Sequence, residues 1–557
     1  MRLHLTLILT AVTLLGAPAM RSPATPQTGP LVIHNYYYAL PGRADSGYRL
    51  RLRASALRAT LGLVPGRVLR RLAGPDSLPD LIWEAEYLDS AARARDAAAA
   101  EANPEFDRIQ HHGHAAAALR AGLLDSRGSG TMIRPGLGPM AALALALSPA
   151  TAATQGKAVR FGKLVPMKGP ALDDAVVVVE GDRIRSVGRG DAAIPRGAEV
   201  IDLRPLTGLP GLIDVHTHMS FYWDRTPGTT PWRQLGTWRT PVLVYLAQEN
   251  LRKTLEAGVT TVRDLGSVDY ADIALRDLIN RGAMVGPRMF VAGAGLHISS
   301  YPIRPGQTEP DPGRTDGVPG VLFAARQQLA QGADWIKLFG STGSDQDVTG
   351  FQTFTFEEMK AAADVAHQAG KRLAIHSYGP DGARDAVRAG AESVEHATDI
   401  DAATLAEMAR RGTFYVPTVD HNRYYIDHRQ EFGYDQAVVE RLSDYIRRNA
   451  ETLRRAVGAG VRIAMGSDAV FTGFGENARE LEWFVKAGMT PEQALAAATT
   501  NGAELLGLED RLGAVAPGYY ADLVGVSGDP LADIRVVITG VRWVMKGGAV
   551  AVTRPRA

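Results

Sequence analysis

The feature that most constrains the fold is a repeated alternation of short apolar runs with amphipathic stretches. Runs of strand length lie at 211–218, 260–266, 288–296, 334–340, 372–378, 393–398, 413–418 and 462–469. The stretches between them have helical character, and residues 356–370 show an apolar stripe and a glycine stop. Eight strand–helix units close into a parallel barrel. We therefore predict an α/β fold with a (β/α)8 TIM barrel over residues 208–504.

Two β-rich segments bracket the predicted barrel, at 157–207 and 505–552. Their runs AVVVVEGDRIRSVG and VITGVRWVMKGG alternate in the manner of strands. Because the two segments border the barrel on both sides in the sequence, we predict that they pair into one composite β-sandwich domain.

The N-terminal part of the chain has the features of an exported protein. An apolar run at 5–16 followed by the sequence APA is typical of a secretory signal peptide, which we assign to residues 1–19. Residues 121–156 contain a second stretch of this kind, either an Ala-rich linker or the export signal of a hydrolase translated from Met132. Neither run reaches the roughly 18 apolar residues of a membrane span. We expect a periplasmic or secreted protein.

The segment between these two stretches, residues 30–120, alternates strand-like and helical runs. Their order resembles one half of a dimeric ferredoxin-like barrel, so we predict a small α+β domain there. His111, His112 and His114 follow at the end of a polar helical run, where a histidine cluster is usually just solvated.

The composition restricts the chemistry that the chain can carry out. The 557 residues include no cysteine, so disulfides and thiolate metal sites are excluded and any metal needs nitrogen and oxygen ligands. The formal net charge is +1 without a block of like charge, which gives no indication of a nucleic-acid partner. We expect small molecules or dipeptides as partners, and a homo-oligomer because soluble enzymes of this size commonly assemble symmetrically.

Polar side chains interrupt the apolar strands at their C-terminal ends, where barrel enzymes carry out their chemistry. These side chains belong to His216, His218, Lys337, His376, His396 and Asp468. His216 and His218 are two residues apart on one strand, so they leave the same face and can share a metal ion. His376 and His396 end successive strands, where they can bind a second ion. Asp468 can bind metal and accept a proton from its water.

Lys337 is the unusual member of this set, because an ammonium group has no lone pair and cannot bind a metal. At the end of its strand it would bury a positive charge in a cationic site, at a high desolvation cost. Carbamylation by CO2 would turn it into a bridging anion. Taken singly, each of these six residues also has an ordinary structural role open to it, such as a pocket wall or a satisfied buried histidine.

Together the motifs resemble those of the amidohydrolase superfamily, in order and over residues 157–552. They are GLPGLIDVHTH, GADWIKLFGS, AIHSYG, SVEHAT and GSDA, followed by APGYYADLVGVSGDPLADI. The resemblance implies a TIM barrel with a small β-sandwich and one or two divalent metal ions. It further implies that a carbamate on Lys337 bridges two zinc ions, one held by His216, His218 and Asp468 and the other by His376 and His396.

Finer motifs are similar to those of prolidase-like and carboxypeptidase-like amidohydrolases, which remove a C-terminal amino acid from dipeptides or N-acyl amino acids. They are GADWIKLFGSTGS, HSYGPDGARDAV, SVEHATDID and GENARELEWFVKAGMTPEQAL. The resemblance implies that Tyr378, Arg384 and His297 engage the substrate. Arginine suits a carboxylate because its planar fork donates two hydrogen bonds. Structural roles stay open: a helix surface for Arg384, wall packing for Tyr378 and a loop position for His297.

The implied mechanism is attack of a metal-bridging hydroxide on the amide carbonyl, with Asp468 moving its proton to the leaving amine. His297 and Tyr378 would stabilise the oxyanion or orient the substrate, and Arg384 would hold the carboxylate of the leaving residue. The Pro- and Gly-rich loop 298–317 would act as a lid. Two alternatives stay open: a cyclic-amide or imidazolone hydrolase, which often uses one metal without the lysine, and a non-catalytic structural member of the fold.

Overall fold

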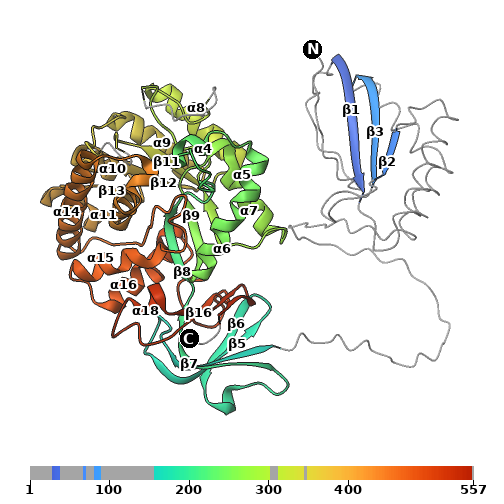
Figure 1. Cartoon of the computed structure of the whole chain (residues 1–557), viewed down its shortest axis with the longest axis vertical. Coiled ribbons are helices and arrows are strands. Elements are labelled where there is room, and N and C mark those ends of the chain that lie inside the picture. Colours follow the sequence, from blue (N-terminus) through green and yellow to red (C-terminus); the bar gives the residue numbers. More distant parts are fainter. Residues whose placement is uncertain are drawn as a thin grey trace, which may run out of the picture. The chain divides into compact units, whose positions relative to one another are not determined.

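The computed structural model describes residues 28–37, 67–70, 81–89, 156–300, 311–343 and 348–554. The chain divides into two compact units, Met1–Leu145 and Ala146–Ala557. In the first unit, strands β1 (Thr28–Tyr37), β3 (Leu81–Asp89) and β2 (Arg67–Arg70) form an antiparallel sheet in that order (Figure 1). The predicted signal peptide, the linker and the cluster at His111 lie outside the described residues, and they stay predictions.

Parallel strands form a barrel at the centre of the second unit. They are β8 (Leu212–Thr217), β9 (Val259–Asp264), β10 (Arg288–Val291), β11 (Trp335–Phe339), β12 (Arg372–Ser377), β13 (Ser393–His396) and β14 (Phe414–Val416). Pairing runs through β10-β9-β8 and through β11-β12-β13-β14. The parallel bridge between Leu296 and Leu338 joins the two groups on one side. The predicted TIM barrel is confirmed.

The eighth predicted strand, 462–469, is much less regular than the apolar run indicated. It makes single parallel bridges from Ile463 to Tyr415 and from Ala469 to Thr217, and these close the barrel between β14 and β8. Between them Asp468 has a left-handed backbone with φ 50°. A strand cannot continue through that conformation, so the run ends as a bend that carries Asp468.

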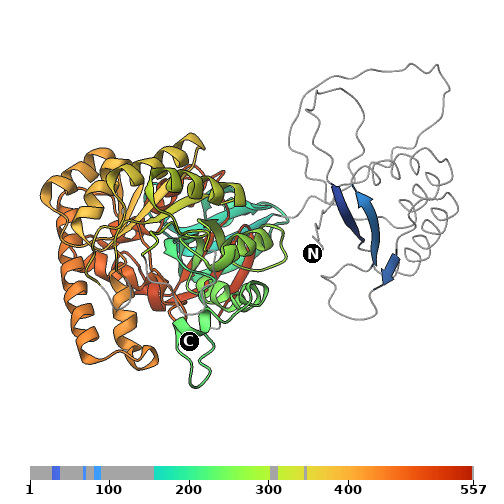
Figure 2. The same ribbon diagram turned by 90° about the horizontal axis from the view of Figure 1, so that it is seen from above.

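Helices form the outer layer of this unit (Figures 1 and 2). Those up to the seventh strand are α4 (Pro231–Leu235), α5 (Thr240–Leu246), α6 (Gln248–Glu256), α7 (Ala271–Asn280), α8 (Gly317–Gln331), α9 (Phe356–Gln368), α10 (Pro380–Ala389) and α11 (Ala402–Arg411). Helix α9 matches its prediction: a capping box between Thr355 and Glu358 begins it, and Gly370 with φ 66° follows its end.

The C-terminal half adds helices after the seventh strand and near the chain end. They are α12 (Val419–Asp427), α13 (Arg429–Phe432), α14 (Gln436–Gly458), α15 (Glu480–Lys486), α16 (Pro491–Ala497), α17 (Thr500–Leu506) and α18 (Val536–Thr539). A short 3-10 helix, η3 (Asn477–Arg479), leads directly into α15. Among the described residues, no helix combines the length and the apolar character that crossing a membrane requires.

The segments on both sides of the barrel contribute strands to one seven-stranded sheet. Its order is β17 (Ala549–Thr553), β16 (Val541–Lys546), β15 (Leu523–Val526), β7 (Glu199–Pro210), β4 (Lys157–Leu164), β5 (Leu172–Glu180) and β6 (Arg183–Arg189). Strand β15 pairs antiparallel with β7, which joins the two segments. On β5, Val177 and Val179 pack in one core cluster, whereas Val176 and Val178 pack in another. The alternation expected of a strand therefore buries both faces there.

Candidate metal centre

The ends of the barrel strands bring imidazoles and a carboxylate together. One ligand-type atom from each of His216, His396 and Asp468 lies within 4.8 Å of the other two, and all three residues are buried. From Asp468 Oδ1, the Nε2 atom of His218 lies at 3.2 Å and that of His216 at 3.6 Å. Ring centroids are 4.9 Å apart between His216 and His396 and 4.5 Å between His396 and His376. Five of the six predicted residues thus form one cluster.

Left-handed backbone conformations set the direction of two side chains in this cluster. The φ angle is 74° at His396 and 50° at Asp468, and such conformations cost about 1–3 kcal/mol in residues other than glycine. Glu395 Oε2 lies 2.8 Å from His216 Nδ1, yet the next residue, His396, also packs its ring on His216. A regular strand would send these consecutive side chains to opposite faces. The turn at His396 therefore brings to the cluster a side chain that alternation would point away.

Lys337 and His376 carry buried polar atoms that have no hydrogen-bond partner, Nζ and Nε2 respectively. The Lys337 Nζ atom lies 5.2 Å from the centroid of the Phe339 ring. Burial lowers the pKa of Lys337 to about 8, although the Glu395 and Asp468 carboxylates oppose this shift. An orphaned buried polar group costs about 1–3 kcal/mol. His376 Nε2 and the other nitrogen and oxygen donors are suitable ligands for divalent metal ions. Lys337 suits the same site if its amine is converted to an anion.

The imidazole nitrogens that face away from the cluster have partners that fix the orientation of their rings. The contacts join His216 Nδ1 to Glu395 (2.8 Å), His218 Nδ1 to the Gly266 carbonyl oxygen (2.8 Å) and His396 Nδ1 to Thr418 Oγ1 (2.7 Å). With Nδ1 donating a hydrogen bond, Nε2 keeps its lone pair for a metal. Metal-binding histidines are typically oriented in this way.

Burial also sets the protonation of the cluster. It lowers the pKa of His216 to about 4 and moves the pKa values of His376 and His396 well below their ordinary value. Burial alone would raise the pKa of Asp468, but the neighbouring His421, His216 and His218 hold it well below its ordinary value. Neutral imidazoles and an ionised carboxylate are the forms that bind metal.

A buried ion pair between Glu395 and Arg263, both 0% exposed, supports the cluster; the sequence analysis missed it. Glu395 Oε1 lies 3.0 Å from Arg263 Nη2, and Arg263 Nε donates to the Val215 carbonyl oxygen at 2.6 Å. Burial raises the pKa of Glu395, but Arg263 and His216 more than offset this and lower it below its ordinary value. Glu395 is therefore an anion that accepts from His216. The sequence did contain a signal for this pair, because Arg263 and Glu395 are charged residues inside two apolar barrel runs.

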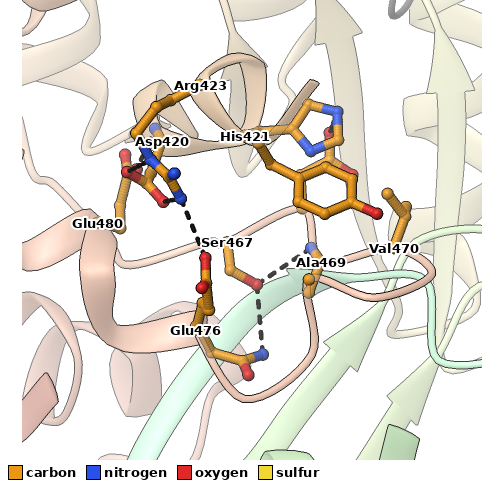
Figure 3. Close-up of a pocket in the computed structure, with 12 residues that line it drawn as sticks. Asp420, His421, Arg423, Ser467, Ala469, Val470, Glu476 and Glu480 are labelled. Atoms are coloured by element: carbon orange, nitrogen blue, oxygen red, sulfur yellow. Dashed lines mark hydrogen bonds and ion pairs between the residues drawn. The ribbon is translucent and has the colours of Figure 1, made fainter. Parts of the chain in front are cut away.

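His421 is a second residue that the sequence analysis missed. It lies on α12, and its Nε2 atom is 3.2 Å from Asp468 Oδ2. The two carboxylate oxygens therefore face different imidazoles, with Oδ1 toward His218 and Oδ2 toward His421. A single histidine in a helix after the seventh strand has no spacing pattern that would indicate this contact. Beside it lies a pocket of about 20 Å³, room for about one water molecule (Figure 3).

Tyr378 packs directly on the cluster, and His297 is linked to it through Phe339. Tyr378 is buried and stacks on His396 at 5.2 Å between ring centroids. His297 Nε2 lies 3.1 Å from Asp311 Oδ2, and the His297 ring faces Phe339, which in turn packs on the His376 ring at 5.2 Å. The predicted lid, 298–317, lies partly outside the described residues.

Arg384 lies on α10, and its guanidinium group pairs with carboxylates of the same helix. Nη1 is 2.8 Å from Asp381 and Nε is 3.0 Å from Asp385, and the side chain is 35% exposed. Binding a substrate carboxylate would therefore require Arg384 to exchange at least one of these partners. The prediction that Arg384 binds substrate stays a prediction.

Comparisons with known proteins agree with this geometry. Residues 207–550 match the model of the amidohydrolase family. An ochratoxinase from Aspergillus niger is 30% identical over 421 residues, which cover 70% of this chain and 85% of the relative. A crystal structure of a Xaa-Pro dipeptidase with bound methionine shares 31% identity and a TM-score of 0.64, over 71% of this chain and 99% of that one. A prolidase complexed with N-methylphosphonate-L-proline shares 29% identity and a TM-score of 0.65, over 72% and 100%.

Proposed function

This chain belongs to the amidohydrolase family and is a hydrolase of amide bonds, and from that premise we propose that it releases the C-terminal amino acid of dipeptides or N-acyl amino acids. The observation that carries the proposal is that Lys337 Nζ and His376 Nε2 are buried without hydrogen-bond partners, while His376 and four other predicted ligands form one cluster. The names of the relatives, a Xaa-Pro dipeptidase, a prolidase and an ochratoxinase, support the substrate class.

In this proposal His216, His218 and Asp468 would hold one zinc ion, and His376 and His396 would hold the other. Lys337 would serve as an anionic ligand once its neutral amine adds CO2 and releases a proton to give a carbamate. When bound, the two ions activate a water for attack and polarise the carbonyl oxygen. The burial of Lys337 supports the carbamate, because an unpaired ammonium would be costly beside two cations.

Proton transfer falls to Asp468, which takes the proton of the attacking water and delivers it to the leaving amine. The contact of its Oδ2 atom with His421 supports this role because it holds the carboxylate in one orientation. Tyr378, stacked on His396, orients the substrate carbonyl, and His297 stabilises the developing oxyanion. Arg384 exchanges Asp381 for the carboxylate of the leaving residue.

The alternatives named from the sequence receive less support. A cyclic-amide or imidazolone hydrolase often uses a single metal and no bridging lysine, whereas Lys337 is buried next to the imidazole cluster. A non-catalytic member of the fold would have no need to keep all six residues, two of them in strained backbone conformations.

The experiment that tests the proposal is release of free amino acids from a panel of Xaa-Pro and Xaa-Phe dipeptides and N-acyl amino acids. Each substrate is paired with its C-terminal amide as a matched control. We expect release from the free acids, little release from the amides, and none after the metal is removed with a chelator. Equal rates on acids and amides would contradict recognition of the carboxylate. Turnover of cyclic amides alone would favour the first alternative.

A further inference from the structure

The segment 475–480, GENARE, has no role in the proposed mechanism, although its side chains reach the supports of the metal centre. Asn477 donates to Asp214 at 2.9 Å, and Glu480 accepts from two backbone amides of α12 at 2.8 Å. We propose that Glu480 is a positioning residue that holds ligands of both metal ions in place through the turn before α12. The inference rests on the proposed two-metal centre.

Glu480 fixes the turn between β14 and α12. Its side chain is 0% exposed, with Oε1 accepting from the Val419 amide and Oε2 from the Asp420 amide. The first amides of a helix have no partner within the helix and need one elsewhere. Thr418 stands at the N-cap position with φ 48° and makes no capping bond of its own. The Glu480 carboxyl group thus replaces the missing N-cap and leaves the Thr418 hydroxyl available for another contact.

The side chains of the fixed turn contact one proposed ligand of each metal ion. Thr418 Oγ1 lies 2.7 Å from His396 Nδ1, which leaves His396 Nε2 for one ion. His421 Nε2 lies 3.2 Å from Asp468 Oδ2, which leaves Asp468 Oδ1 on the side of His218 for the other ion. A displacement of the turn would therefore move ligands of both ions together.

Asn477 acts on the same centre through Asp214, which is 0% exposed. Asp214 Oδ1 accepts from the backbone amides of Ser467 at 2.9 Å and His216 at 3.2 Å. These two amides belong to a ligand and to the residue before Asp468. Figure 3 shows Ser467, Glu476 and Glu480 around the pocket, with Arg423 reaching toward Asp420 and Glu476. One segment thus supports the barrel-end backbone and the α12 turn together.

The test compares variants that alter these contacts with a matched loss of an ordinary helix cap. Thr418→Val removes the hydroxyl at nearly constant shape, Thr418→Ser keeps it, and Glu480→Gln loses one of the two acceptors. Asp435→Ala is the control, because Asp435 caps α14 by accepting from the Val438 amide. The readouts are zinc affinity, measured by competition with a chelating dye, and the visible spectrum of the cobalt-substituted protein.

We expect Thr418→Val and Glu480→Gln to lower zinc affinity about 10–100-fold, the usual effect of losing a partner of a metal ligand, and to alter the cobalt spectrum. Thr418→Ser should keep the zinc affinity and the cobalt spectrum of the wild type, and Asp435→Ala should lower only the melting temperature. Unchanged affinity and spectrum in Thr418→Val would overturn the inference, as would an equal loss in Asp435→Ala.

If Glu480→Gln does not fold, the comparison of Thr418→Val with Thr418→Ser decides. A wild-type protein that binds no zinc overturns the proposed function as well, whereas a zinc-dependent wild type with an unaffected Thr418→Val overturns this inference alone.

Discussion

Asp468 and Lys337 lie near the same imidazole cluster, but one side chain is an acid and the other is a base. Asp468 is surrounded by histidines on both of its oxygens, whereas Lys337 Nζ has no hydrogen-bond partner. A carboxylate in such surroundings is ready to bind and to move a proton. An amine in the same surroundings needs conversion to an anion before it can take part. The two residues therefore give different predictions when each is replaced.

We predict that Asp468→Ala abolishes turnover, by a factor of about 10³ or more, while zinc content stays largely intact because the histidines remain. Lys337→Ala should lose both turnover and zinc, since the bridging anion disappears with the amine. Steady-state kinetics and metal analysis of both purified variants check this. Full activity of Lys337→Ala would refute the carbamate bridge.

Arg384 gives a prediction about substrate recognition. Arg384→Ala should raise KM for free-acid substrates about tenfold or more, since a hydrogen bond to a charged group contributes about 1.5–3 kcal/mol, and should leave the C-terminal amides unaffected. Arg388→Ala on the same helix is the matched control, because Arg388 is half exposed and pairs with Glu407. If the two variants behave alike on both substrate types, Arg384 is a surface residue of α10.

Sequence reasoning reached the residues at strand ends and missed those brought in by other means. Five of the six predicted ligands follow from the rule that barrel chemistry lies where strands end, whereas Lys337 lies in the middle of β11. Glu395 was missed because alternation places it opposite His396, and only the left-handed backbone at His396 brings both toward His216. His421 and Thr418 were missed because their contacts depend on the direction of α12, which no local pattern encodes.

At the scale of elements, the sequence predicted the positions of seven barrel strands well but did not predict the irregular form of the eighth. Six apolar runs agree with β8, β9 and β11 through β14 within two residues at each end, because buried parallel strands are continuous apolar runs, whereas the run 288–296 continues five residues past the end of β10. The eighth run makes only bridges, since the left-handed backbone at Asp468 interrupts it. The order of helices after β14 depends on packing and could not be read from the apolar pattern.

Helix α15 gives a prediction about pH. Burial raises the pKa of Glu480 to about 8, so between pH 5 and pH 8 the folded chain keeps a proton that the unfolded chain has released. The contribution of Glu480 to stability is therefore fully present at low pH and falls as pH rises, by up to about 4 kcal/mol. Glu480→Gln has no such group and should lack this slope.

The measurement is chemical denaturation of wild type and Glu480→Gln at several values between pH 5 and pH 8. The difference in unfolding free energy between them should shrink as pH rises. Glu451→Gln serves as the control, since Glu451 pairs with Arg454 at the surface and such pairs add little. Parallel curves for wild type and Glu480→Gln would contradict the prediction.

At the scale of the whole molecule, the unit Ala146–Ala557 contains the seven-stranded sheet, the barrel and every candidate site residue. We predict that a chain starting at Met132 keeps the zinc content and turnover of the full chain, as comparison of the two purified proteins would show. Loss of folding or activity in the shorter chain would give the N-terminal part a role in the hydrolase. We also propose export to the periplasm or medium, which N-terminal sequencing of the native protein tests.

The central claim is that the six residues form a two-metal centre that cleaves amide bonds. Its most direct test is a titration of metal-free protein with zinc, in which release of an amino acid from the best panel substrate is measured after each addition. We predict activity that rises to a plateau at two zinc ions per chain. A plateau at one ion, or activity that is independent of zinc, would contradict it.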